Sequence, residues 1–183
     1  MEPFTYSSTP TTQMTSASSP CAPGFLTITF DDIINASSVQ GAVPTTYRCF
    51  NWVNGWYANV SGFAVTNGFR RALASGAYIV LNRNGTSMNI TRTNSSFHVH
   101  SFVASAGYQD PLHLLLKGIQ GSSTLAYQQD LLVNTSYART ITLNWYNLTT
   151  LNYQTYSYNN ASGTNSTGLG QQFSMDNLNV TLT

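Results

Sequence analysis

Residues 25–30 read Phe-Leu-Thr-Ile-Thr-Phe, and this short stretch decides the class of fold. Its side chains alternate in polarity, and successive residues of an extended chain point to opposite faces. Leu26, Ile28 and Phe30 therefore share one apolar face, while Phe25 and the two threonines share the other. This period of two is typical of a half-buried strand in an antiparallel sheet.

The rest of the chain also predicts β-structure. Apolar or alternating runs recur at a spacing of about 8–12 residues and are separated by Gly and Asn turns. Asn54-Gly55, within the aromatic stretch 47–57, is typical of a β-hairpin turn. We expect no helix, and the fold class is all-β: a jelly-roll-type antiparallel β-sandwich with an extended N-terminal tail. Further strands are expected at 61–65, 77–81, 88–91, 97–103, 112–118, 124–129, 140–145, 151–156 and 175–182.

The N-terminal segment, residues 1–24, differs from this body. After Glu2 it carries no charge, and serine, threonine and proline dominate it. Such a segment buries too little apolar surface to offset the entropy of ordering it, so it is not expected to fold alone. The predicted organisation is an assembly tail at 1–24 followed by one β-sandwich domain at 25–183. The predicted anchors of the tail are Phe4, Tyr6 and Met14.

The surface of this protein needs a solubilising group other than charge. Charged residues make up 7% of the chain, against about 25% in a typical soluble domain. The net charge of +1 would not attract nucleic acid, and no apolar run is long enough to span a membrane. Ten Asn-x-Ser/Thr sequons occur, more than the serine and threonine content would produce by chance. N-linked glycans are therefore predicted at Asn35, Asn59, Asn84, Asn89, Asn94, Asn134, Asn147, Asn160, Asn165 and Asn179.

The cysteine content agrees with an extracellular protein. Cys21 and Cys49 form an even pair, for which a disulfide is the default and two buried free thiols are the alternative. The bond would close a loop of about 28 residues, contribute about 3–4 kcal/mol and fasten the root of the tail. With the sequons, it predicts the eukaryotic secretory pathway. The chain start lacks the basic and apolar segments of a signal peptide, so a signal is expected to have been removed or left out of this numbering.

Carboxylates suited to catalysis are few. A glycosidase uses two of them about 5–10 Å apart, and the sequence suggests no such pair. Asp31 and Asp32 are adjacent, so on a strand they would point to opposite faces. We therefore predict that the protein is not an enzyme and requires no cofactor.

Two metal sites are open alternatives. His98 and His100 would share one face of a strand, and His113 on a neighbouring strand would complete a zinc site. The favoured alternative is an exposed polar face, with Phe97 and Val99 facing inward. In a jelly roll the first and last strands often pair, which would bring Asp31 and Asp32 to Asp176 and form a structural calcium site. The alternative is that these aspartates cap strand ends.

Four stretches resemble secreted jelly-roll domains of the carbohydrate-binding-module and lectin kind. They are TFDD at 29–32, FNWVNGWY at 50–57, FHVHSF at 97–102 and FSMDNLNV at 173–180. The resemblance spans about Phe25 to Thr183 and implies sugar binding by rings that stack on exposed aromatic side chains, often with a structural calcium ion. The platform implied here is Trp52, Trp56 and Tyr57, although core positions are the alternative for each.

Two functions follow from these patterns. The first is a structural subunit of an extracellular glycoprotein filament, a head-to-tail homopolymer in which the N-terminal tail docks on the next subunit as an added strand. The alternative is a secreted, lectin-like module that binds carbohydrate through exposed aromatic side chains. Burial of the tryptophans separates the two, because a solvent-facing row favours the lectin.

Overall fold

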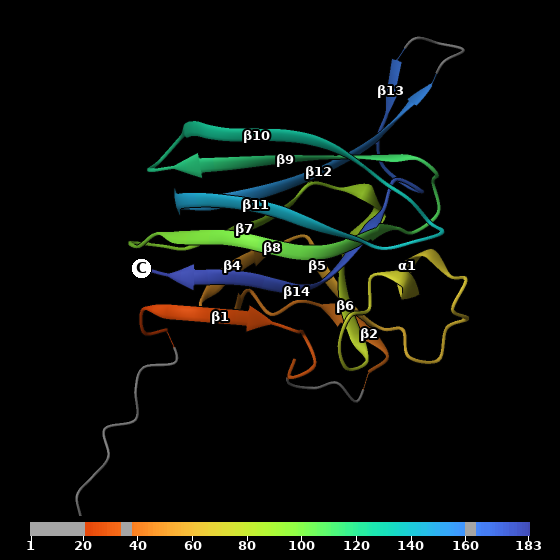
Figure 1. Cartoon of the computed structure of the whole chain (residues 1–183), viewed down its shortest axis with the longest axis horizontal. Helices are drawn as coiled ribbons and strands as arrows, with labels where there is room; N and C mark the ends of the chain where they lie inside the picture. Colours follow the sequence, from red (N-terminus) through yellow and green to blue (C-terminus); the bar gives the residue numbers. More distant parts are fainter. Residues whose placement is uncertain (1–20, 34–37, 160–163) are drawn as a thin grey trace, which may run out of the picture.

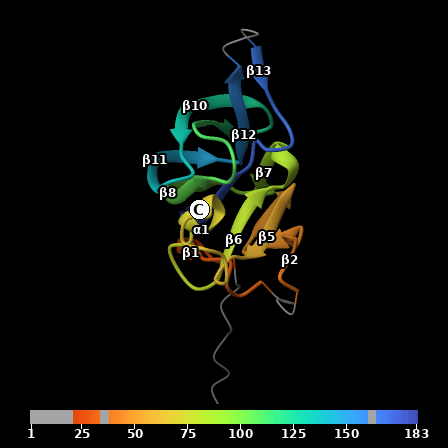
Figure 2. The same cartoon turned by 90° about the vertical axis from the view of Figure 1, so that its right-hand side faces the viewer.

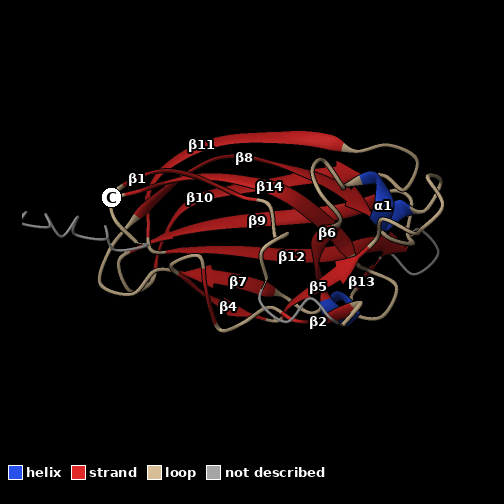
Figure 3. Ribbon diagram, turned by 90° about the horizontal axis from the view of Figure 1, so that it is seen from below, coloured by secondary structure: helices blue, strands red, loops and turns tan. Residues whose placement is uncertain are grey.

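The protein is an antiparallel β-sandwich, seen here in a computed structural model that describes residues 21–33, 38–159 and 164–183. Two sheets pack face to face, and most strands run along the long axis of the molecule (Figures 1 and 3). The all-β prediction is confirmed. The predicted tail anchors Phe4, Tyr6 and Met14 lie outside the described residues.

The first sheet has seven strands and contains both ends of the described domain. Its strand order is β11 (Arg139–Leu148), β8 (Phe97–Ala106), β14 (Phe173–Leu182), β6 (Tyr78–Asn82), β5 (Gly55–Asn59) and β2 (Gln40–Ala42). The remaining strand, β1 (Gly24–Ile28), pairs with β14, so that Phe25 lies opposite Thr181 and Ile28 opposite Leu178. The expected pairing of the first and last strands is therefore confirmed.

The second sheet also has seven strands. Its order is β10 (Thr124–Val133), β9 (Leu112–Gln120), β12 (Thr150–Asn159), β7 (Met88–Thr91), β4 (Phe50–Val53) and β3 (Thr46–Tyr47). A short strand, β13 (Thr164–Ser166), pairs with the end of β12 and projects from the sandwich (Figure 2).

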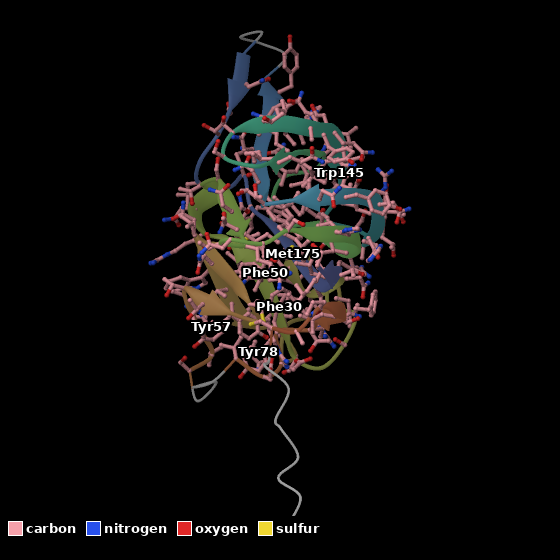
Figure 4. The ribbon with its side chains drawn as sticks, turned by 90° about the vertical axis from the view of Figure 1, so that its left-hand side faces the viewer. Phe30, Phe50, Tyr57, Tyr78, Trp145 and Met175 are labelled. Atoms are coloured by element: carbon pink, nitrogen blue, oxygen red, sulfur yellow. A yellow bond between two sulfur atoms is a disulfide. The ribbon has the colours of Figure 1, made fainter. Side chains whose placement is uncertain are left out.

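Aromatic side chains fill the space between the sheets (Figure 4). Phe50 and Phe97 meet edge to face at 4.9 Å between ring centroids, and Phe30 meets Trp52 at 5.7 Å. Each such pair adds about 0.5–1.5 kcal/mol beyond the area it buries. The inward face that the sequence predicted for residues 25–30 belongs to this core, with Ile28 at the end of β1 and Phe30 just beyond it both buried.

The turn at Asn54-Gly55 connects the two sheets and does not form a hairpin. In the described chain β4 pairs with β3 and β7, whereas β5 pairs with β2 and β6. Asn54 has a φ of 61°, as a tight turn through Asn-Gly requires, and its side chain donates to the carbonyl of Ser87. The sequence identified the turn correctly, but the hairpin prediction is wrong because the turn carries the chain across the sandwich.

Two short helices lie at one end of the sandwich. The strand expected at 61–65 is absent from the described chain, and a loop leads instead into α1 (Gly68–Arg71). Asn67 caps α1 by accepting hydrogen bonds from the backbone N–H groups of Phe69 and Arg70. The second helix, η1 (Arg83–Gly85), links β6 to β7. The helices of the described residues are too short to cross a membrane.

The predicted disulfide is present between Cys21 and Cys49. It ties the chain just before β1 to the turn between β3 and β4, and so connects a segment leading to the first sheet with the second sheet. A disulfide fits a secreted or extracellular domain, because it persists in an oxidising environment.

Candidate functional site: a groove beside Trp56

The three aromatic residues of the expected sugar platform do not form a row. Trp52 is 3% exposed and Tyr57 is 6% exposed, and both pack in the core between the sheets. Trp52 donates through Nε1 to the carbonyl of Tyr47, and the Tyr57 hydroxyl bonds Ser38. The platform prediction is therefore wrong for these two residues, because the turn between β4 and β5 directs both into the interior. Trp56 remains, on the outer face of the first sheet.

Beside Trp56 lies an open groove of about 770 Å³, a size typical of small-ligand sites. Its floor is a small apolar cluster on the outer face of β5 and β6, separate from the main core. The loop leading to α1, the segment after β8 and the segment before β14 form its walls, at the end of the molecule seen in Figure 2. We call this the Trp56 groove; it is lined by Gln40, Trp56, Ala58, Val60, Phe63, Asn67, Phe69, Leu81, Arg83, Asn84, Tyr108, Leu169, Gly170 and Gln172.

Its walls expose large apolar side chains to solvent. Phe63 is 41% exposed, Tyr108 67% and Leu169 82%. The Tyr108 ring packs edge-on against the buried ring of Phe69, with 4.9 Å between the ring centroids. This contact helps to fix the orientation of Tyr108. These exposed rings offer flat apolar surfaces to a ligand.

Arg83 covers one face of Trp56. The guanidinium carbon lies 3.9 Å from the ring centroid, a cation–π contact worth about 0.5–1 kcal/mol at an exposed site. The Arg83 residue is itself exposed, so its N–H groups are positioned to donate to a ligand. The pair therefore combines an aromatic surface with hydrogen-bond donors.

Two glycines make the groove wall possible. A Cβ on Gly68 would lie 2.3 Å from the carbonyl oxygen of Ala106, and a Cβ on Gly107 would lie 2.3 Å from the ring of Phe69. The start of α1 can approach the end of β8 only because both positions lack a side chain. Ser105 adds to this contact by donating to the carbonyl of Gly68.

Of the residues that line this groove, the sequence singled out two: Trp56 as part of a sugar platform and Asn84 as a glycosylation site. Phe63 was assigned to a strand, and Tyr108 lies in a connection after β8 without any motif around it. For Tyr108 the only signal was an aromatic residue between predicted strands, and for Phe63 there was none, because the strand expected at 61–65 hid the loop.

A second hollow lies on the outer face of the second sheet, beside β13. There Asp130 accepts hydrogen bonds from the Tyr156 hydroxyl and from Nδ1 of His113, whose ring stacks on Tyr156 at 4.5 Å. The hydrogen bond to the carboxylate, with partial burial, raises the pKa of Tyr156 to about 12. The amides of Gln128 and Gln154 complete this polar surface, and its described lining residues include no strongly exposed apolar side chain like those of the Trp56 groove.

Two of the three aspartates proposed as calcium ligands, Asp31 and Asp176, bind the backbone of one loop, and the third does not. Asp31 accepts from the backbone N–H groups of Ala77 and Tyr78, while the buried Asp176 accepts from those of Ala74 and Ser75. Both therefore hold the same connection between α1 and β6.

Asp32 points elsewhere, to the hydroxyl of Tyr47 and the guanidinium of Arg48. Across the described residues, no group of three or more His, Cys, Asp or Glu side chains is placed to hold a metal ion. A calcium site made by all three aspartates does not fit this arrangement, because Asp32 is directed into its own cluster.

The three histidines do not converge. His98 and His100 lie on β8 in the first sheet, and His113 lies on β9 in the second. His100 bonds the hydroxyl of Thr181, and His98 meets Tyr146 edge to face. The zinc hypothesis therefore fails because the sheets separate its ligands.

The predicted glycosylation sites differ in accessibility. Asn35 and Asn160 lie outside the described residues. Four sequon asparagines are exposed: Asn84, Asn94, Asn147 and Asn165. Four others are half-buried, with side chains hydrogen-bonded to neighbouring groups: Asn59, Asn89, Asn134 and Asn179.

No protein-family model and no curated protein matches this sequence. Among solved structures, the chain is similar to the K2 cleaved adhesin domain of Lys-gingipain, with a TM-score of 0.42 and 10% identity over 87% of this chain and 97% of that one. It is also similar to the tandem CBM22 domains of Paenibacillus barcinonensis Xyn10C, with a TM-score of 0.41 and 10% identity over 91% of this chain and 47% of that one.

A further similar structure is a xylan-binding domain from CBM 22. Its TM-score is 0.36 and its identity 13%, over 88% of this chain and 96% of that one. Carbohydrate-binding modules and adhesin domains thus recur among the solved structures similar to this chain. At these identities and TM-scores, the likeness does not extend to a ligand.

Proposed function

We propose that this protein is a non-catalytic, extracellular glycan-binding module and that the Trp56 groove holds the sugar. The observation that supports this is the grouping of exposed aromatic rings with amide and guanidinium groups in one open groove. Pyranose rings have apolar C–H faces and polar hydroxyl edges. A site that offers both flat rings and directed hydrogen-bonding groups matches that chemistry.

The groove suggests a role for each of its members. Tyr108 and Phe63 are the exposed rings on which a sugar would stack. Arg83, held against Trp56, and the amides of Gln40 and Gln172 would bond the sugar hydroxyls. The groove is open, so it suits a short section of a longer chain.

Binding by the wild-type protein and two variants tests this proposal. Soluble xylan and β-1,4-galactan in affinity gels, together with a glycan array, serve as probes. We expect Tyr108→Ala to weaken binding by on the order of tenfold or more, since truncating an aromatic anchor costs at least about 1–2 kcal/mol. The matched control is Tyr146→Ala, an exposed tyrosine of β11 at the opposite end of β8.

Two results would contradict the proposal. One is a wild-type protein that binds none of these glycans. The other is an equal loss of affinity in Tyr108→Ala and Tyr146→Ala, because binding would then not depend on the groove.

Filament assembly is a second candidate function. It is favoured by the outermost strands β10 and β11, ten residues each, which have a partner on only one side among the described residues. Such edges can accept an added strand from another chain. We predict that a chain lacking residues 1–20 assembles less than the full chain in size-exclusion chromatography; equal assembly would contradict this candidate.

A further inference from the structure

Asn84 occupies a distinctive place beside the Trp56 groove. It lies in η1 directly after Arg83, whose guanidinium stacks on Trp56. A third and smaller hollow, of about 510 Å³, shares Trp56, Arg83 and Asn84 with the groove. These three residues therefore form the ridge between the two hollows, and anything attached to Asn84 begins at the mouth of the groove.

The amide of Asn84 is accessible for modification. The residue is exposed and begins the sequon Asn84-Gly85-Thr86. Within the part of the chain that the structure describes, no residue hydrogen-bonds its side chain, in contrast to Asn179, whose Nδ2 donates to Ser101. The backbone of this turn packs closely against the segment before β14, because a Cβ on Gly85 would lie 2.0 Å from the carbonyl oxygen of Gly168.

We propose that Asn84 carries an N-linked glycan and that this glycan covers the mouth of the Trp56 groove, limiting the access of external sugars. An oligosaccharyl transferase would form a bond between Nδ2 of Asn84 and C1 of an oligosaccharide. The donor is a lipid-diphosphate-linked oligosaccharide; the lipid diphosphate leaves, and Nδ2 loses one proton. The claim about access rests on the proposed function, whereas the modification and the covering do not.

A local explanation competes with this proposal. Asn84 has a φ of 55°, and asparagine is favoured at positive φ whether or not it is modified. Asn147 provides a matched control, because it is an exposed sequon asparagine with a φ of 57°. It lies at the end of β11 that pairs with Phe97, whereas Tyr108 of the groove follows the opposite end of β8. Aspartate also tolerates positive φ, so Asn84→Asp and Asn147→Asp remove the modification site without changing the turn.

The test uses the full chain secreted from eukaryotic cells. Peptide mass spectrometry after enzymatic deglycosylation, which converts modified asparagine to aspartate, measures occupancy at Asn84. Acrylamide quenching of tryptophan fluorescence measures covering without any ligand. Trp52 and Trp145 are 3% and 7% exposed, so quenching reports mainly on Trp56, which is only partly buried. Enzymatic deglycosylation of the folded wild-type protein provides a second measurement that does not depend on a variant.

We expect Asn84 to be occupied, and quenching to increase in Asn84→Asp and after deglycosylation but not in Asn147→Asp. If the glycan covers the groove for half to nine-tenths of the time, its removal should strengthen sugar binding by about 2–10-fold. An unmodified Asn84, or unchanged quenching on its removal, would overturn the inference. Increased quenching without sugar binding by any form would support the covering and overturn the proposed function.

Discussion

Trp52 and Trp56 stand on either side of one turn, yet the fold gives them opposite roles. Trp52 lies between the sheets, with its ring edge-on to Phe30 and its N–H bonded to a backbone carbonyl. Trp56 lies on the outer face of the first sheet, under the guanidinium of Arg83 and beside an open groove. Residues of the same type in one aromatic stretch thus divide between the core and the surface beside the groove.

The difference shows how this sandwich forms a site. The turn at Asn54-Gly55 crosses from one sheet to the other, so residues on its two sides enter different environments. Beyond the turn, the alternation of β5 sends Tyr57 inward and leaves Trp56 outside. A groove then forms only where α1 and the segment after β8 rise beside Trp56.

The sharpest test of this comparison is truncation of each tryptophan. Trp52→Ala should lower the free energy of unfolding by about 3–5 kcal/mol, because it leaves a cavity in the packed core. Trp56→Ala should lower it by about 1–2 kcal/mol, because the side chain is half-buried on the small outer cluster and solvent can fill the space that it leaves. Urea unfolding followed by circular dichroism measures both values. Equal losses would mean that the two tryptophans share one environment.

A smaller effect is expected from Gly68→Ala, which tests the wall of the groove. The added methyl group would meet the carbonyl of Ala106 and displace α1, at a cost of about 1–3 kcal/mol. Gly62→Ala is the control, because a Cβ there has no atom within 4 Å. We expect Gly68→Ala to lose sugar binding at a temperature where it remains folded, as judged by near-UV circular dichroism. Unchanged binding would show that the position of α1 does not matter to the groove.

The smallest expected effect concerns Asp176, which holds the connection behind α1. Burial raises the pKa of this carboxyl, and nearby Asp31 raises it further, although backbone N–H groups of Ser75, Ala74 and Asn177 act in the opposite direction. A carboxyl whose pKa is raised on folding contributes stability that is fully present below its unfolded pKa of about 4 and is lost as pH rises through the folded pKa.

Asp176→Asn should remove that pH-dependent loss. We therefore expect the free energy of unfolding of the wild-type protein, relative to the variant, to fall as pH rises from about 4 toward neutrality. Urea unfolding at a series of pH values measures this difference. Parallel pH profiles for the two proteins would contradict the expectation.

Much of the fold was predictable from local pattern. The alternation in residues 25–30 identified a strand with one buried face, and the pairing of the first and last strands followed from the expected fold. The disulfide followed from the pair of cysteines. The loop at 61–67 and the helix after it were missed, because a short apolar run such as Phe63 to Val65 does not itself say whether it is covered.

The candidate site was far less predictable. Trp56 was identified, but Trp52 and Tyr57 were placed beside it only because they are near in sequence. Tyr108 lies far from Trp56 in the chain and lines the same groove only in the folded protein, and the loop that carries Phe63 was not expected. The three aspartates show the same limit, since Asp31 and its neighbour Asp32 are directed to different partners.

The sequence by itself determined that this chain forms β-strands, that its cysteines pair, and that many asparagines carry the motif for glycosylation. These properties depend on neighbouring residues or on residue type, which the sequence states directly. Only the tertiary structure decided which aromatic residues face solvent and which sequon borders the groove. Those outcomes depend on where the chain passes from one sheet to the other. The packing of residues far apart in the chain determines these positions.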